Sequence, residues 1–95
     1  MQFIVTVDTE ADNQWEAGRP LSLEYLRCLP SFQELCRRYA IRPSYLFTLE
    51  VAEHSEAIRP LRAWVEHGEA EVGAHLHPWT TPPFEDTAGR RFNDP

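Results

Sequence analysis

The sequence has no apolar run of transmembrane length, and no charged-then-apolar signal segment precedes its first strand-like stretch. We therefore expect no membrane partner and, by default, a cytoplasmic location. Its two cysteines, Cys28 and Cys36, are too few for a disulfide framework and lack metal-type spacing. On one helix they would lie roughly 12 Å apart, too far to bridge, so we expect two buried, small apolar side chains.

The sequence also lacks an excess of basic residues. Nine Lys and Arg residues stand against 15 Asp and Glu residues, giving a net charge of -6, which speaks against nucleic-acid or anionic-membrane binding. A hydrophobic content of 42% argues against disorder. We treat residues 1–95 as one small domain at most, without internal repeats.

Three short apolar stretches predict strands at residues 2–7, 44–48 and 69–77. The first is a nearly continuous apolar and β-branched run, which is typical of a strand buried on both faces, and the second, with Tyr45, Leu46 and Phe47 at its centre, predicts a second buried strand. The polar stretch 9–20 predicts a loop of a length that is often functional.

Two helical patterns separate the strands. The first begins with Pro30 in its first turn, and a shorter helical piece over 22–29 precedes it. Four residues of this first helix share one stripe: Phe32, Leu35, Cys36 and Tyr39. The second runs over 55–67, with Leu61 and Trp64 on its apolar stripe and Gly68 as a left-handed cap. Residues 78–95 have no periodicity.

The predicted fold class is therefore α/β, a βαβαβ unit of parallel strands joined by right-handed crossovers. In such sheets, sites form at the carboxyl ends of the strands. Asp8 and Glu10 follow the first strand, while His75 and His77 end the third. The two histidines are two residues apart and should share a face. We expect all four at one sheet edge.

Two histidines and a carboxylate are a common ligand set for a catalytic divalent metal such as zinc. A second carboxylate nearby can act as general base on water, so these four residues supply the parts for hydrolysis of an amide or ester. Each part also has a plainer interpretation. Asp8 can cap the next segment, and Glu10 can be a solvated loop acid. Trp15 and Asn13 can contact a polar substrate or pack the loop, and Trp79 has the same two interpretations.

These residues resemble a known family. Residues 6–10 (TVDTE) resemble the first motif of the polysaccharide deacetylases, the NodB-homology domain of carbohydrate esterases. Residues 71–79 (EVGAHLHPW) resemble the second motif, and residues 42–47 (RPSYLF) resemble the second strand. The similarity covers most of residues 2–79.

The resemblance implies metal-dependent removal of acetyl groups from N-acetylated sugars on a distorted (β/α) barrel, whose first part this chain would form. It implies Asp8 as the base and His75 and His77 as metal ligands. Thr9 stands where the family has a second adjacent aspartate. Either Glu10 reaches the metal, or Asp8 is the ligand and another group is the base. The histidines are two residues apart, whereas the family's are four apart, and variants of this kind act on other small amides.

The family's later motifs have no counterpart after Trp79, and a complete barrel takes roughly 200 residues or more. We interpret residues 1–95 as a partial domain, truncated after the second motif. We expect it to bind metal weakly and, without the family's general-acid histidine, to turn over little or nothing. We also expect it to self-associate or be completed by another chain, because three parallel strands leave two unpaired edges. The alternatives are another metallohydrolase, of amidohydrolase or phosphoesterase type, and a non-catalytic α/β module that needs a partner chain.

Overall fold

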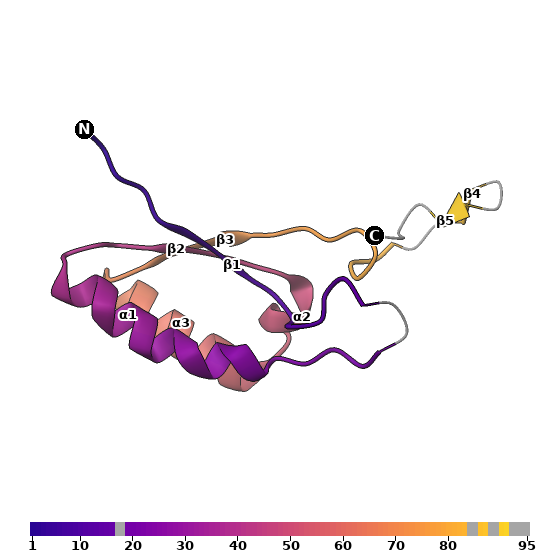
Figure 1. Cartoon of the computed structure of the whole chain (residues 1–95), viewed down its shortest axis with the longest axis horizontal. Helices are drawn as coiled ribbons and strands as arrows, with labels where there is room; N and C mark the ends of the chain where they lie inside the picture. Colours follow the sequence, from indigo (N-terminus) through magenta and orange to yellow (C-terminus); the bar gives the residue numbers. More distant parts are fainter. Residues whose placement is uncertain (17–18, 84–85, 88–89, 92–95) are drawn as a thin grey trace.

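The computed structural model describes residues 1–16, 19–83, 86–87 and 90–91. Its centre is a three-stranded parallel sheet in the order β1-β2-β3, formed by β1 (Thr6–Thr9), β2 (Ser44–Phe47) and β3 (Glu71–Ala74). The crossovers contain α1 (Leu29–Arg38) and α3 (Ser55–Glu66) (Figure 1). The predicted βαβαβ parallel unit is thus confirmed, and the sheet is open in the part of the chain described.

Four shorter elements complete the described chain. The 3-10 helix η1 (Glu24–Cys28) precedes α1, as the helical piece over 22–29 predicts. One turn of helix, α2 (Leu49–Ala52), follows β2 and was not predicted. Two-residue strands β4 (Asp86–Thr87) and β5 (Arg90–Arg91) pair antiparallel in the stretch 78–95, where the lack of periodicity predicts no strand. Within the described ranges, no helix is both long and apolar enough to cross a membrane.

The strands are shorter than the apolar runs that predict them. Phe3 and Ile4 belong to the predicted first strand but lie outside β1, with 78% and 77% of their surfaces exposed. The Ser44 N–H donates to the Val5 carbonyl, which starts the pairing of β1 with β2. β3 ends at Ala74, so both candidate histidines follow the strand instead of belonging to it.

Both helices lie on the same side of the sheet (Figure 1). The strand order β1-β2-β3 moves each crossover in the same direction, and right-handed crossovers then place both helices on one face. Tyr45 and Leu61 lie in the core between helices and sheet. Asp8 and Glu71 are exposed on the strands, so the prediction of strands buried on both faces is wrong.

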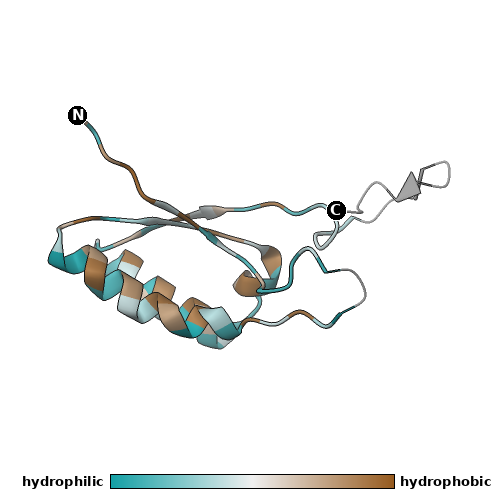
Figure 2. Cartoon of the chain, viewed as in Figure 1, coloured by the Kyte–Doolittle hydropathy of each residue, from teal (hydrophilic) through white to brown (hydrophobic). Residues whose placement is uncertain are grey.

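The buried stripe of α1 differs from the predicted one. Leu29, Gln33 and Cys36 are buried, whereas Leu35 and Tyr39 are exposed. A polar residue was not expected in the stripe, but the Tyr45 hydroxyl donates to Gln33 Oε1 at 2.7 Å, and Gln33 Nε2 donates to the Glu69 carbonyl at 3.1 Å. Bands of hydrophilic and hydrophobic residues alternate along both helices (Figure 2).

The cysteines have different environments. Cys36 is buried as predicted, but Cys28 is exposed because it ends η1, which has no buried residue.

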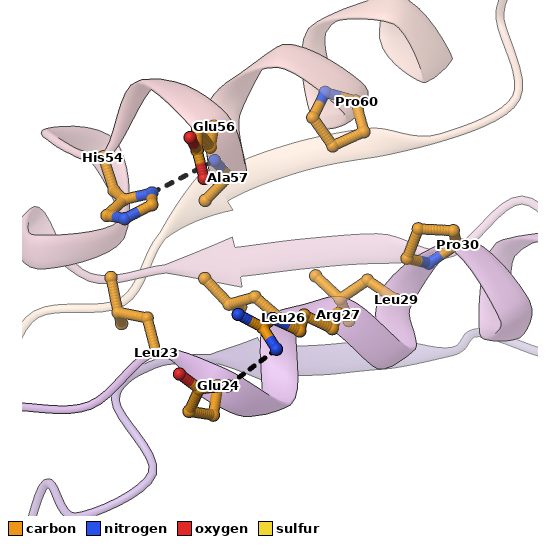
Figure 3. A pocket seen from close by; sticks show the side chains of 10 residues that line it. All are labelled: Leu23, Glu24, Leu26, Arg27, Leu29, Pro30, His54, Glu56, Ala57 and Pro60. Atoms are coloured by element: carbon orange, nitrogen blue, oxygen red, sulfur yellow. Dashed lines mark hydrogen bonds and ion pairs between the residues drawn. The ribbon is translucent and has the colours of Figure 1, made fainter.

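A hollow of about 330 Å³ lies between η1 and the start of α3, where His54 Nδ1 caps α3 by accepting the Ala57 N–H (Figure 3). At the other end of α3, Gly68 has the predicted left-handed conformation, with φ of 70°.

Candidate metal site

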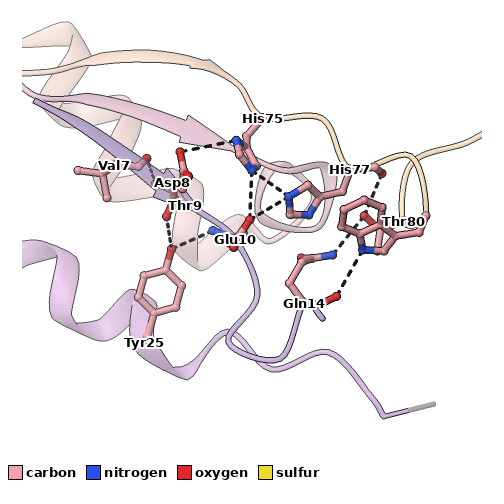
Figure 4. A network of polar contacts seen from close by, with 10 residues as sticks. Val7, Asp8, Thr9, Glu10, Gln14, Tyr25, His75, His77 and Thr80 are labelled. Atoms are coloured by element: carbon pink, nitrogen blue, oxygen red, sulfur yellow. Dashed lines mark hydrogen bonds and ion pairs between the residues drawn. The ribbon is translucent and has the colours of Figure 1, made fainter. Parts of the chain in front are cut away.

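The chain leaves β1 through a turn that a tyrosine of η1 holds in place. The Glu10 N–H donates to the Tyr25 hydroxyl at 2.8 Å, and that hydroxyl donates to the Asp8 carbonyl at 3.2 Å (Figure 4). Burial raises the pKa of Tyr25, so the hydroxyl keeps the proton that it donates. Thr9, between the two acids, is fully buried and donates from its Oγ1 to the Val7 carbonyl. Tyr25 therefore fixes the backbone on both sides of Thr9.

Glu10 meets the two histidines at the carboxyl edge of the sheet. Its Oε2 lies 3.2 Å from Nε2 of His75 and 3.0 Å from Nε2 of His77. The two Nε2 atoms are 2.8 Å apart. All three donor atoms thus point toward one another, from segments that are 65 residues apart in the sequence (Figure 4).

This donor set fits a metal ion. Zinc binds His nitrogen and carboxylate oxygen at about 2.0–2.2 Å, so tetrahedral ligands lie about 3.3 Å from one another. The observed separations of 2.8, 3.0 and 3.2 Å lie within about half an ångström of that value. Glu10, His75 and His77 can therefore hold a metal ion. Their nitrogen and oxygen donors also suit other divalent transition metals.

Asp8 lies beside this group and outside it. Its Oδ1 is 3.6 Å from Nδ1 of His75, the ring nitrogen that does not face Glu10. The Asp8 side chain is 62% exposed. This separation is longer than a hydrogen bond, and the exposure leaves the carboxylate open to water.

Aromatic rings surround His77, which is buried. Its ring stacks on Trp79 with the centroids 4.5 Å apart and the planes at 17°, and the Trp15 ring lies 5.7 Å away. The Nδ1 atom of His77 has no hydrogen-bond partner among the described residues. The His77 ring also meets the His75 ring edge-on, with the centroids 4.6 Å apart, and its Nε2 faces Glu10.

The loop after Glu10 is ordered by its own polar residues. The Asp12 carboxylate accepts hydrogen bonds from the Ser22 hydroxyl, the Glu24 N–H and the Tyr25 N–H at 2.8–3.1 Å. Asn13 accepts from the Ser22 N–H and donates to the Pro20 carbonyl. Asp12 and Asn13 thus pack the loop and hold η1, which is the plainer of the two interpretations of Asn13.

Two residues near this edge were missed by the sequence-based prediction. Tyr25 gave no signal, because its role depends on contact with a distant turn. Glu50 could have been found from the sequence, because it is an acid just after β2, at the same edge as the residues after β1 and β3. Both of its carboxylate oxygens are buried and have no hydrogen-bond partner among the described residues. The rule that selected Asp8 and Glu10 also selects Glu50.

The Tyr25→Phe variant tests whether the tyrosine positions Glu10. It removes both hydroxyl contacts while keeping the ring, and we expect zinc affinity to fall about tenfold, as for other residues that orient metal ligands. The free energy of unfolding should fall by about 1 kcal/mol. Calorimetric zinc titration and urea unfolding measure the two effects. Tyr39→Phe, at an exposed hydroxyl, is the control, and equal zinc affinity in both variants would contradict the positioning role.

No protein-family model matches this chain, and comparisons with curated proteins and with solved structures give no match either. The function must therefore be inferred from the residues themselves.

Proposed function

We propose that this chain carries the metal centre of a hydrolase that removes acetyl groups from N-acetylated carbohydrate. Glu10, His75 and His77 would hold a divalent metal, with zinc as the first choice. The observation that carries the proposal is the convergence of three donor atoms, each within 3.2 Å of the other two.

The arrangement suits hydrolysis because three protein ligands leave a position open for water or substrate. When bound, a divalent metal supplies Lewis-acid activation of water and of the acyl carbonyl. Asp8 is the exposed acid beside His75 and would accept the proton from the attacking water. If Asp8 instead only orients His75, Glu50 is the next acid at this sheet edge to test as the base.

The choice of an N-acetyl group on a sugar rests on the resemblance of residues 6–10 and 71–79 to the deacetylase motifs. In the fold these two segments end β1 and β3, so the residues that carry the resemblance are the residues that meet. The net charge of -6 makes an uncharged substrate more favourable than an anionic one such as a phosphate ester.

The reaction is tested by measuring acetate released from tri-N-acetylchitotriose, with zinc and after chelation. We expect slow release that requires zinc and falls at least a hundredfold in His77→Ala, which removes one of the three ligands. His67→Ala should behave as wild type, since His67 ends α3 and is exposed. Phosphate release from p-nitrophenyl phosphate without acetate release would replace the proposal with a phosphoesterase.

A non-catalytic module is the second candidate, favoured by the sheet itself. One face of the sheet carries both helices, while Asp8 and Glu71 are exposed, and β1 and β3 are its edge strands. Unpaired strand edges are templates for pairing with another chain. A chain that binds no zinc, and whose folded state appears only in an assembly, would fit this candidate and not the hydrolase.

A further inference from the structure

We propose that Trp15 and Trp79 form a stacking subsite beside the metal centre, and that it binds the apolar face of an uncharged or cationic pyranose ring. The choice of a sugar rests on the proposed function. The subsite itself rests on the ring geometry, the ordering of the loop and the local charge.

The two indoles continue the ring system that starts at the candidate ligand His77. Trp79 stacks on His77, and the Trp15 centroid lies 4.7 Å from that of Trp79 with the planes at 46°. Trp15 remains 63% exposed although its ring contacts both Trp79 and His77. An indole this open, in contact with a candidate metal ligand, offers a large apolar surface where a bound substrate would lie.

Hydrogen bonds hold the two segments that carry these rings together. Trp79 Nε1 donates to the Gln14 carbonyl at 3.3 Å, and Gln14 Nε2 lies 3.5 Å from Thr80 Oγ1. Gln14 itself is buried, and Thr80 Oγ1 also donates to the His77 carbonyl at 3.3 Å. The backbone next to Trp15 is therefore ordered before any ligand arrives, which lowers the entropy cost of binding.

The charges around the subsite select the ligand. The faces of aromatic rings attract cations and the weakly positive C–H groups of a ring that lies flat on them. Glu10 contacts His77, on which Trp79 stacks, Asp8 lies beside His75, and the only described ion pair of Glu16 is with Arg19, at 2.7 Å. A divalent ion at the metal centre balances the carboxylates of Asp8 and Glu10, while the net charge of the chain stays negative, which disfavours uronic acids and sugar phosphates and suits an N-acetylated amino sugar or its deacetylated, cationic product.

The experiment titrates the zinc-supplemented full chain with tri-N-acetylchitotriose and follows its three indole N–H signals by NMR. Signals of Trp15 and Trp79 should shift, while the signal of Trp64, which packs against Tyr45 in the core, should not. Trp15→Ala should weaken sugar binding at least tenfold, and Trp15→Phe should weaken it less because a ring remains. Tyr39→Ala, at an exposed aromatic residue on the C-terminal cap of α1, should bind as wild type.

Unchanged affinity in Trp15→Ala, or equal binding of trigalacturonate, would overturn the subsite. If Trp15→Ala does not fold, the indole N–H shifts of the wild type and the sugar affinity of Trp15→Phe are the deciding measurements. A Trp64 shift equal to that of Trp15 overturns the proposal. Sugar binding that depends on Trp15 in a chain that binds no zinc would uphold the subsite and remove the hydrolase. Zinc-dependent acetate release, together with unchanged sugar affinity in Trp15→Ala, would uphold the hydrolase and overturn the subsite.

Discussion

Zinc at about one hundred times its dissociation constant is expected to raise the melting temperature of this chain by about 10–20 °C. A ligand at that concentration that binds only the folded state stabilises it by about 2.7 kcal/mol, and each kcal/mol shifts a domain of this size by about 4–8 °C. The donors of Glu10, His75 and His77 come together only in the folded chain, so binding is linked to folding. Circular-dichroism melting with zinc and with a chelator measures the shift.

The His75→Ala, His77→Ala double variant should lose this shift, since it keeps only one of the three ligands. His67→Ala is the matched control, because it removes an exposed histidine at the end of α3 and should keep the full shift. Magnesium should shift the wild type much less than zinc, because it prefers oxygen ligands. A zinc shift of equal size in the double variant would rule out the proposed site.

Leu61→Ala is expected to cost about 2–5 kcal/mol, the usual range for a leucine truncated in a core. Leu61 is only 2% exposed and lies in the single core cluster of the described residues, with Tyr45 and Val51. Domains have free energies of unfolding of about 5–15 kcal/mol, and small ones lie at the low end. The variant should therefore retain at most about 3 kcal/mol and unfold at a much lower urea concentration than the wild type, as urea titration followed by circular dichroism will show.

Val65→Ala is the matched control for this substitution. Val65 lies one turn further along α3 and is 38% exposed, so its truncation should cost well under 1 kcal/mol. If the two variants unfold at the same urea concentration, the core does not lie between α3 and the sheet.

The order of the elements could be predicted because it depends on local chemistry. Helical periodicity, Pro30 and Gly68 mark the helices without reference to the rest of the chain. The ends of the strands could not be predicted, because a strand extends only as far as a neighbouring strand pairs with it. Phe3 and Ile4 are as apolar as β2 but lie beyond the paired residues. The buried face of α1 was misplaced because Gln33 is polar and its partner Tyr45 is on another element.

At the site, the carboxyl-end rule correctly placed Asp8, Glu10, His75 and His77 together. The prediction that both histidines lie on one face of a strand was wrong, because β3 ends at Ala74, before either histidine. Their convergence on Glu10 comes from the backbone after the strand. The clamp by Tyr25 and the stacked indoles depend on contacts between distant segments, which residue types and spacing do not encode.

The strand order determines how a bound metal ion would affect the sheet. β1 and β3 are opposite edges of the sheet and do not pair, yet Glu10 follows one and His75 follows the other. An ion held between them would cross-link the outer strands over the end of β2, closing a loop of 65 residues. Because the ion binds only the folded chain, the stabilisation that this cross-link provides depends on the zinc concentration relative to the dissociation constant. Chelation should therefore first loosen the outer strands, and amide exchange there should speed up before exchange in α1 and α3.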